Sequence, residues 1–324
     1  MRRRGDTVQT EAGLAALLSV PIVLWAASFW ATEIGGDETS ALMFSALRTA
    51  PAALLLLSVL PFARSGLPRG RMWIWAAVTG LLTVVVFFEG LSEGTLRAGA
   101  GNAAVLTNTP PFFVLVLGWF FLGERLSRLG IGGLLLGFAG VLVMVSSQLG
   151  GTSDVADLVV GIVFALAAAA SWAIGTIIVK WLVVRDPNLD LLSLTAGQYV
   201  IGAPILLALA FGVDGAAGTE WSSAELWGSA VWLAVGASVI ATLCYFAALK
   251  RVPATRVSAW LFLSPVVAVL IELGRGHTPD GVVLVGMVLA IAGVAIVNVA
   301  PQSAGQRDGL LLTEPPAEQG RAAG

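Results

Sequence analysis

Ten apolar segments, each long enough to cross a lipid bilayer, dominate this sequence. They lie at approximately residues 14–32, 40–62, 72–91, 99–122, 129–149, 158–179, 191–213, 226–249, 257–273 and 281–300. A membrane-spanning helix needs about 20 predominantly apolar residues, and a lone segment in hydrocarbon satisfies its backbone polar groups only as an α-helix. The pattern therefore predicts an all-α polytopic membrane protein with ten transmembrane helices.

Composition and charge exclude several other classes of protein. Hydrophobic residues make up 57% of the chain and charged residues 12%, about half the charge of a soluble domain. The 18 Lys and Arg against 20 Asp and Glu leave no positive field for nucleic acid. Cys244 and His277 are the single cysteine and the single histidine, so neither an internal disulfide nor a Cys/His metal cluster is expected. No Walker A sequence is present, and we expect no cofactor and no catalytic residue.

The distribution of Lys and Arg predicts the orientation. If the ten segments alternate across the bilayer, all but three of the 18 basic residues fall on the side of the N-terminus. The three exceptions are Arg48 within the second segment and Arg97 and Arg275 on the opposite side. Basic loops stay in the cytoplasm, so both termini are expected there, in a multi-pass protein of the cell (inner) membrane.

The two halves of the chain resemble each other. Residues 100–111 align with residues 254–265 at a shift of 154 positions, which places Pro111 on Pro265, and Gly133 and Gly140 align with Gly286 and Gly293 at a shift of 153. Five spans per copy is an odd number, so the second copy must be inverted in the membrane. We expect a cytoplasmic N-terminus at 1–13, five-helix repeats at 14–150 and 151–300, and a disordered cytoplasmic tail at 301–324.

Prolines at the middle of the fourth and ninth spans predict helix breaks. Pro110, Pro111 and Pro265 lack an N–H and clash with the carbonyl four residues earlier. Such freed carbonyls are tolerated in a membrane where protein or a wet cavity satisfies them. The breaks mark a candidate binding cavity or gate, with Thr107 and Asn108 as adjacent polar groups. The alternative is a purely structural kink.

Arg48 is the basic side chain placed deepest in a span, about seven residues from its outer end. A charge at that depth costs about 2.5–3.5 kcal/mol on insertion scales. Three interpretations are open: snorkelling to the surface, a structural ion pair, or binding an anionic group of a substrate in a cavity. Gln198 is the approximate counterpart of Arg48 in the second repeat and is a second substrate-binding candidate.

Two aromatic and two acidic residues complete the candidate sites. Trp25 and Trp172 lie near the middle of the first span of each repeat, away from the interfaces that tryptophan prefers. They either pack in the protein core or line a substrate pathway. Glu89 and Glu272 lie at the outer ends of spans and are candidates for proton coupling, with an ordinary interfacial carboxylate as the alternative reading.

Several short motifs in a fixed order resemble one family. They are Ala100-Gly101-x-Ala103-Ala104-Val105-Leu106-x-x-Thr109-x-Pro111, then Leu122-Gly123-Glu124-Arg125-Leu126-Ser127, then Gly133…Gly140-Val141, with Trp25-Ala26-Ala27-Ser28-Phe29 and Phe44…Arg48 before them. Together they resemble the ten-helix, EamA-type members of the drug/metabolite transporter superfamily. The resemblance covers residues from about 14 to 300.

The resemblance implies two five-helix repeats around a central cavity and transport of small metabolites or amino acids, often export. Inverted repeats of this kind allow alternating access to a central site. The expected partners are a small-molecule substrate and the lipid bilayer, in a monomer or homodimer. The chain departs from the family where Arg275-Gly276-His277 replaces a second Leu-Gly-Glu, and where 90–99 holds an extra helical turn. A membrane-embedded enzyme acting on lipid or lipid-linked substrates is the alternative function.

Overall fold

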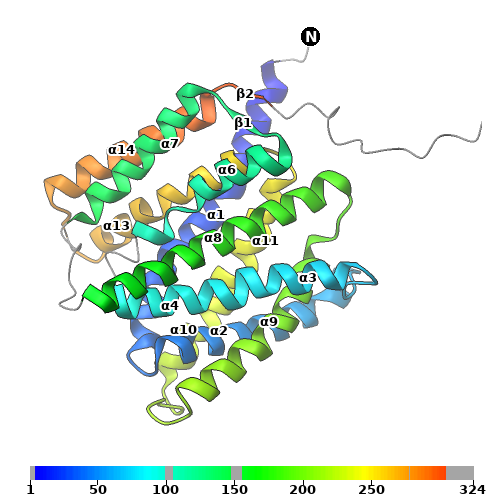
Figure 1. The fold of residues 1–324 in the computed structure, drawn as a ribbon, viewed down its shortest axis with the longest axis vertical. Coiled ribbons are helices and arrows are strands. Elements are labelled where there is room, and N and C mark those ends of the chain that lie inside the picture. The colour runs from blue at the N-terminus through cyan, green and yellow to red at the C-terminus, as the bar shows by residue number, and fades with distance from the viewer. Residues whose placement is uncertain (1–3, 99–104, 147–154, 277, 304–324) are drawn as a thin grey trace, which may run out of the picture.

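The structure is a computed structural model that describes residues 4–98, 105–146, 155–276 and 278–303. Long helices make up most of this part of the chain (Figure 1). Nine of the described helical segments are long and apolar enough to cross a membrane, and Arg128–Met144 is a shorter apolar helix. The predicted ten-helix polytopic fold is confirmed.

The first repeat begins with α1 (Arg4–Gly36) and α2 (Ala41–Phe62). The third span is one continuous rod made of α3 (Met72–Gly80), the π-helix η1 (Leu81–Val86) and α4 (Phe87–Ala98). The fourth span consists of residues 105–107 and α6 (Pro110–Leu122), and the fifth is α7 (Arg128–Met144). The third span thus continues past its predicted end at residue 91, through the extra turn noted in the sequence.

The second repeat follows the same order. It begins with α8 (Val155–Arg185) and α9 (Leu191–Val213), and its last helix is α14 (Gly281–Val299). Its third span is again continuous and consists of α10 (Ala224–Leu233), the π-helix η3 (Ala234–Ile240) and α11 (Ala241–Leu249). Its fourth span is composed of α12 (Ala254–Ala259), the 3-10 helix η4 (Trp260–Leu263) and α13 (Ser264–Gly274). Each repeat therefore has a π-helical segment in its third span and a break in its fourth.

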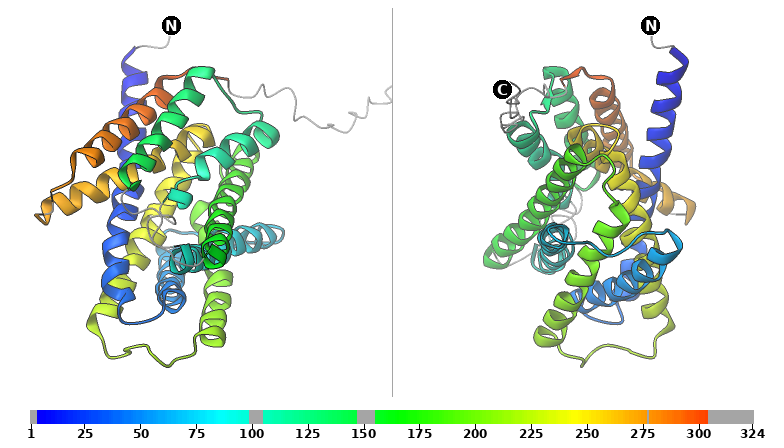
Figure 2. Two further views of the ribbon diagram at one scale, coloured as in Figure 1. Left: turned by 60° about the vertical axis from the view of Figure 1, so that its left-hand side comes forward. Right: turned by 90° about the vertical axis from the view of Figure 1, so that its right-hand side faces the viewer.

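Two pairs of equivalent helices, α2 with α9 and α7 with α14, pack against each other in antiparallel fashion. A Cβ on Gly140 would meet Ala290, whereas one on Gly133, earlier in α7, would meet Ile296, later in α14. In the same way Ser40, before α2, donates a hydrogen bond to Asp214, after α9. Figures 1 and 2 show α7 and α14 side by side along their length. This arrangement places the repeats around a pseudo-two-fold axis that lies across the helices, as inversion requires.

Side-chain caps fix where equivalent helices begin. The Ser40 hydroxyl accepts a hydrogen bond of 3.1 Å from the Met43 N–H at the start of α2. The Asp190 carboxylate accepts one of 3.0 Å from the Ser193 N–H at the start of α9. Each cap satisfies one of the four N–H groups that a helix leaves without a partner.

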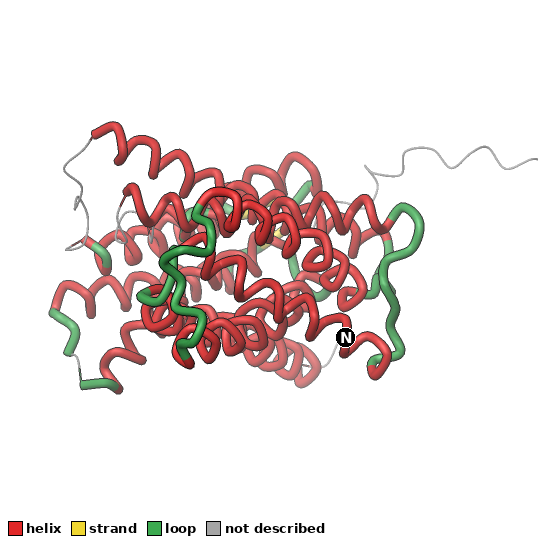
Figure 3. Tube along the Cα trace, turned by 90° about the horizontal axis from the view of Figure 1, so that it is seen from below, coloured by secondary structure: helices red, strands yellow, loops and turns green. Residues whose placement is uncertain are grey.

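The loops of the bundle separate into two ends. We call the end with the loops 63–71, 123–127, 186–190 and 250–253 the basic end, and the end with the loops 37–40 and 214–223 the acidic end. Figure 3 shows loops gathered at opposite ends of the helices. At the basic end, β1 (Arg125–Leu126) pairs with β2 (Gln302–Ser303) in antiparallel register. The predicted tail thus begins with two residues paired to the first repeat, and residues 304–324 lie outside the described part.

Candidate functional site

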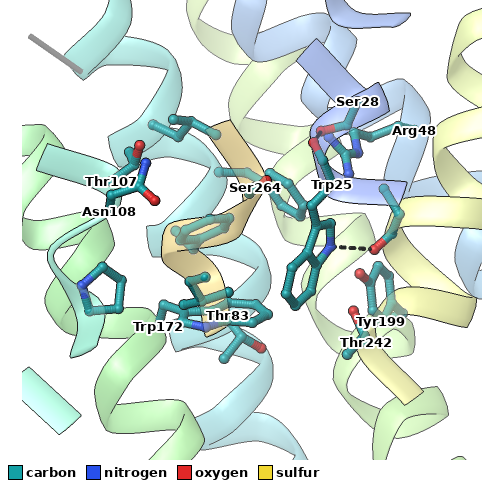
Figure 4. A pocket seen from close by; sticks show the side chains of 16 residues that line it. Trp25, Ser28, Arg48, Thr83, Thr107, Asn108, Trp172, Tyr199, Thr242 and Ser264 are labelled. Atoms are coloured by element: carbon teal, nitrogen blue, oxygen red, sulfur yellow. Dashed lines mark hydrogen bonds between the residues drawn. The ribbon is translucent and has the colours of Figure 1, made fainter. Parts of the chain in front are cut away.

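A cavity lies between the two repeats, in the middle of the bundle (Figure 4). Eight spans line it, four from each repeat, whereas no lining residue of this cavity comes from α7 or α14. The lining residues are Trp25, Ser28, Arg48, Thr83, Phe87, Phe88, Leu91, Thr107, Asn108, Pro110, Trp172, Tyr199, Ala237, Thr242, Leu261 and Ser264.

The cavity is large enough for a small metabolite. The space open to the centres of water-sized molecules is about 140 Å³, roughly ten times what a single water needs. Its full empty volume, with the open mouth, is about 880 Å³.

Aromatic rings form one continuous wall of the cavity. The ring centroids of Trp25 and Trp172 lie 5.5 Å apart at an interplanar angle of 87°, an edge-to-face contact. Phe87 lies 5.1 Å from Trp172, and Phe88 lies 5.3 Å from Phe87. The first helices of the two repeats therefore meet through their mid-span tryptophans, which both point into the shared cavity.

Arg48 lies in the wall of this cavity, with 8% of its surface exposed. Its guanidinium carbon lies 4.5 Å from the centroid of the Phe88 ring, and Nη2 donates a long hydrogen bond of 3.3 Å to the Ser238 hydroxyl. Its buried Nε has no hydrogen-bond partner, and no ion pair joins Arg48 to any described residue. A buried cation without a counter-ion is costly, since its desolvation is offset by no opposite charge.

The π-helix η3 supplies the polar contacts of this wall. The Ala237 carbonyl accepts a hydrogen bond of 3.0 Å from Trp25 Nε1, and the Ser238 carbonyl accepts one of 3.2 Å from the Tyr199 hydroxyl. A π-helical turn shifts the backbone bonds from the usual spacing and is frequent at functional sites. Here the turn brings the Ala237 carbonyl to Trp25 of α1, the Ser238 hydroxyl to Arg48 of α2 and the Ser238 carbonyl to Tyr199 of α9.

A related contact joins the symmetry-related pair of helices, α9 of the second repeat and α3 of the first. The Gln198 side-chain nitrogen donates a hydrogen bond of 2.8 Å to the Thr79 hydroxyl, just before η1. Gln198 is fully buried and is not among the residues that line the cavity. The two sides of the pseudo-two-fold axis therefore differ in charge, because a neutral amide stands where the first repeat has a guanidinium.

The predicted breaks coincide with the ends of helical segments. Pro110 and Pro111 are the first two residues of α6, and Ser264 and Pro265 are the first two of α13. The Leu106 carbonyl accepts hydrogen bonds from the N–H and hydroxyl of Thr109, at 3.0 and 2.6 Å. The Leu261 carbonyl accepts from the Ser264 N–H. Local turns thus satisfy both carbonyls, and Thr107, Asn108, Pro110 and Ser264 line the cavity.

The remaining candidates lie outside the cavity lining. Pro111 is buried and Pro265 is half-buried, each beside a lining residue. Glu89 is half-buried in α4, and within the described part of the chain its Oε2 has no hydrogen-bond partner. Glu272 is half-buried and forms an ion pair of 2.5 Å with Arg275. His277 lies outside the described residues.

Several lining residues were missed by sequence reasoning, Tyr199 and Thr242 among them. A usable signal exists for Tyr199. The chain has two tyrosines, and both Tyr199 and Tyr245 lie in mid-helix rather than at the interfaces where tyrosine is enriched. Tyr245 is buried, with its ring 5.5 Å from Trp25 and 5.7 Å from Trp172.

Comparison with known proteins identifies the family. The EamA-like transporter family matches residues 13–146 and again residues 159–299. The chain belongs to this family. The resemblance seen in the sequence is thereby confirmed, and the two matches coincide with the two helical repeats described above.

Relatives of this EamA-like protein carry transporter names. It is 27% identical over 285 residues to "Uncharacterized transporter YvbV" of Bacillus subtilis (strain 168), which covers 88% of this chain and 91% of that one. It is 28% identical over 293 residues to a Salmonella typhimurium (strain LT2) protein named "Probable amino-acid metabolite efflux pump", with 88% and 93% covered. The family and these names indicate a membrane transporter rather than an enzyme.

A solved crystal structure shares the fold. It superposes with a TM-score of 0.76 at 20% sequence identity and covers 88% of this chain and 96% of the other. At that identity the likeness concerns the fold alone, and the site described here rests on the contacts within this chain.

Proposed function

We propose that this protein is a secondary transporter that exports small metabolites, such as amino acids or their derivatives, by alternating access. The observation that supports this most is the central cavity between two antiparallel repeats, with a helix break from each repeat and the buried Arg48 in its wall. Secondary transporters built from inverted repeats bind substrate at such breaks near the bilayer midplane. The name of the Salmonella relative supports the substrate class.

The proposed substrate ligands are cavity residues of both repeats. Arg48 binds an anionic group, and Trp25 and Trp172 contact the apolar body. Thr107 and Asn108 supply polar contacts beside the break of the fourth span. The prolines at the two breaks act as gating points at which the halves of a span change angle. Gln198, away from the cavity lining, joins the two repeats through its hydrogen bond to Thr79.

Orientation and coupling are parts of the same proposal. With the basic end in the cytoplasm, both termini are cytoplasmic and the acidic end faces outward. Proton coupling is assigned to Glu89, because its buried Oε2 has no hydrogen-bond partner among the described residues, whereas Glu272 is paired with Arg275.

Counterflow in proteoliposomes tests this function. Vesicles with the purified protein, loaded with unlabelled solute, are exposed to traces of labelled amino acids and small carboxylates. We expect transient accumulation of a labelled substrate, absent from protein-free vesicles and from the Arg48→Ala variant. Repeating the assay with a pH gradient tests the coupling. If folded protein exchanges no member of the panel, the proposed function is wrong.

A further inference from the structure

The described lining of the central cavity carries a positive charge and no negative charge. Arg48 is a cation in its wall, and none of the described lining side chains is a carboxylate. The other polar lining groups are neutral: hydroxyls, the indole N–H groups of Trp25 and Trp172, the Ala237 carbonyl and the Asn108 amide. The cavity is thus built for negative charge, since an anion would offset the desolvation of the guanidinium.

Arg48 retains donors for that anion. A guanidinium has five N–H donors in a planar fork. Nη2 donates a hydrogen bond of 3.3 Å to Ser238, the Nε N–H is enclosed by protein, and no hydrogen bond joins Nη1 to any described residue. The guanidinium carbon lies 4.5 Å from the centroid of the Phe88 ring, a cation–π contact, and the N–H donors point outward along the edge of the planar guanidinium group. Two parallel hydrogen bonds to a carboxylate are the strongest contact that such an edge makes.

The rest of the cavity fits an apolar body rather than a second charge. In Figure 4, Arg48 and Ser28 lie on one side, Thr107 and Asn108 lie on the opposite side, and the rings of Trp25 and Trp172 lie between them. A carboxylate at Arg48 therefore places the remainder of the molecule against the tryptophans. Stacking on these rings stabilises an apolar or aromatic group.

An ammonium group has no comparable partner there. In an α-amino acid the ammonium is two bonds from the carboxylate carbon, so a carboxylate held by Arg48 brings the ammonium near a like charge. Like charges repel strongly where water is largely excluded. Aromatic faces attract cations, but here they are shared with the apolar body, and no described lining carboxylate neutralises the ammonium.

We propose that this cavity selects small hydrophobic monoanions, namely carboxylates with an apolar or aromatic body and without a charged amine. Deaminated and N-acylated derivatives of amino acids belong to this class, and free zwitterionic amino acids are poorer ligands. The proposal rests on the proposed transport function for its physiological meaning, but it concerns binding and is tested by binding.

Three probes with the same phenylethyl body isolate the effect of charge. They are 3-phenylpropionate, an anion; phenylalanine, a zwitterion; and phenethylamine, a cation. Dissociation constants are measured by titration calorimetry on the purified full-length protein in detergent. We expect 3-phenylpropionate to bind at least ten times more tightly than phenylalanine, and phenethylamine to show no saturable binding.

Two substitutions link this order to Arg48. Arg48→Gln should abolish binding of 3-phenylpropionate, whereas Arg71→Gln, the same change at an exposed arginine outside the cavity, should leave it unchanged. If Arg48→Gln fails to fold, Arg48→Lys provides the test, because it keeps the charge and loses the fork. Its affinity for 3-phenylpropionate should fall severalfold while the order of the probes is kept.

The outcomes separate this inference from the transport function. Phenylalanine binding as tightly as 3-phenylpropionate, or phenethylamine binding more tightly, would overturn the charge selectivity. An unchanged affinity in folded Arg48→Gln would overturn the role of Arg48. Selective binding without counterflow would instead count against transport and leave the selectivity standing.

Discussion

The carboxylate of Glu124 caps a helix of the opposite repeat. It accepts hydrogen bonds from the backbone N–H groups of Ala254 at 2.8 Å and Thr255 at 3.1 Å, and from the Thr255 hydroxyl at 3.1 Å. Glu124 follows α6 in the first repeat, Ala254 begins α12 in the second, and the glutamate is 6% exposed. The Leu-Gly-Glu segment thus ties the fourth span to the ninth at the basic end.

The first prediction concerns this tie. Glu124→Ala should lower the unfolding temperature by about 5 °C or more, because two backbone N–H groups lose their acceptor in a buried site, at about 1–3 kcal/mol each. Glu124→Gln, which keeps one acceptor oxygen, should lower it less. Thermal unfolding followed by a tryptophan signal measures both. If wild type and Glu124→Ala unfolded at the same temperature, the hydrogen bonds of Glu124 would make no net contribution to the stability of the folded protein.

The second prediction concerns the glycines that align α7 with α14. A Cβ on Gly293 would lie 2.3 Å from the Gly137 nitrogen, which is backbone and cannot move aside cheaply. Gly293→Val should therefore separate the two helices and reduce the yield of folded protein, as close small-residue contacts drive helix association in membranes. Gly132→Ala is the control on α7, because nothing lies within 4 Å of its Cβ position. Size-exclusion profiles of both variants give the comparison.

Much of the fold could be predicted from the sequence because a helix needs about 20 predominantly apolar residues to cross a bilayer. The second and seventh spans, predicted at 40–62 and 191–213, agree with α2 and α9 within a residue. The π-helices η1 and η3 were not predicted, since an i→i+5 turn has no distinct residue signature. Leu81 and Ala234, their first residues, are 153 positions apart, close to the shift of the sequence repeat.

The candidate site was predictable where a residue broke the apolar pattern. Arg48, Trp25, Trp172, Thr107 and Asn108 were singled out as charge, mid-span aromatics or neighbours of proline, and the structure brings them to one cavity. Gln198 was chosen by repeat register alone, and the adjacent Tyr199 lines the cavity instead. Gln198 does occupy the position in α9 that Arg48 has in α2, but its side chain bonds to Thr79. Successive residues of a helix point about 100° apart, and repeat register alone does not say which of them faces the cavity. The roles of these residues in binding stay predictions.

The third prediction concerns the breaks. The triple variant Pro110→Ala, Pro111→Ala and Pro265→Ala restores three N–H donors and removes three ring clashes, so the fourth and ninth spans should become straighter. We expect counterflow to fall at least tenfold while thermal stability is kept or raised. A stable variant with wild-type counterflow would mean that the breaks are structural kinks without a part in gating.

The fourth prediction concerns orientation. Reporter fusions after Arg71, Arg128, Arg185 and Arg251 should indicate the cytoplasm, and fusions after Asp37, Asp157 and Glu220 the exterior, because basic loops are retained inside. Asp157 lies in the first turn of α8, next to the connection between the repeats. A cytoplasmic signal there would contradict the proposed orientation.

The last prediction separates a binding role of Arg48 from a structural one. If Arg48 served as an ion-pair partner of Glu89, removing both charges in Arg48→Ala with Glu89→Gln should restore what Arg48→Ala loses. No ion pair joins these two residues, and the guanidinium instead contacts Phe88 and Ser238. We therefore expect Arg48→Ala to be folded and inactive in counterflow, and the double variant to be no better.

Arg48→Ala with Glu225→Gln, a change at an exposed acid of the acidic end, controls for net charge. Recovery of counterflow in the Glu89 double variant alone would assign a structural role to Arg48. Loss of counterflow in both double variants would instead support a role of Arg48 in binding substrate at the cavity that it lines.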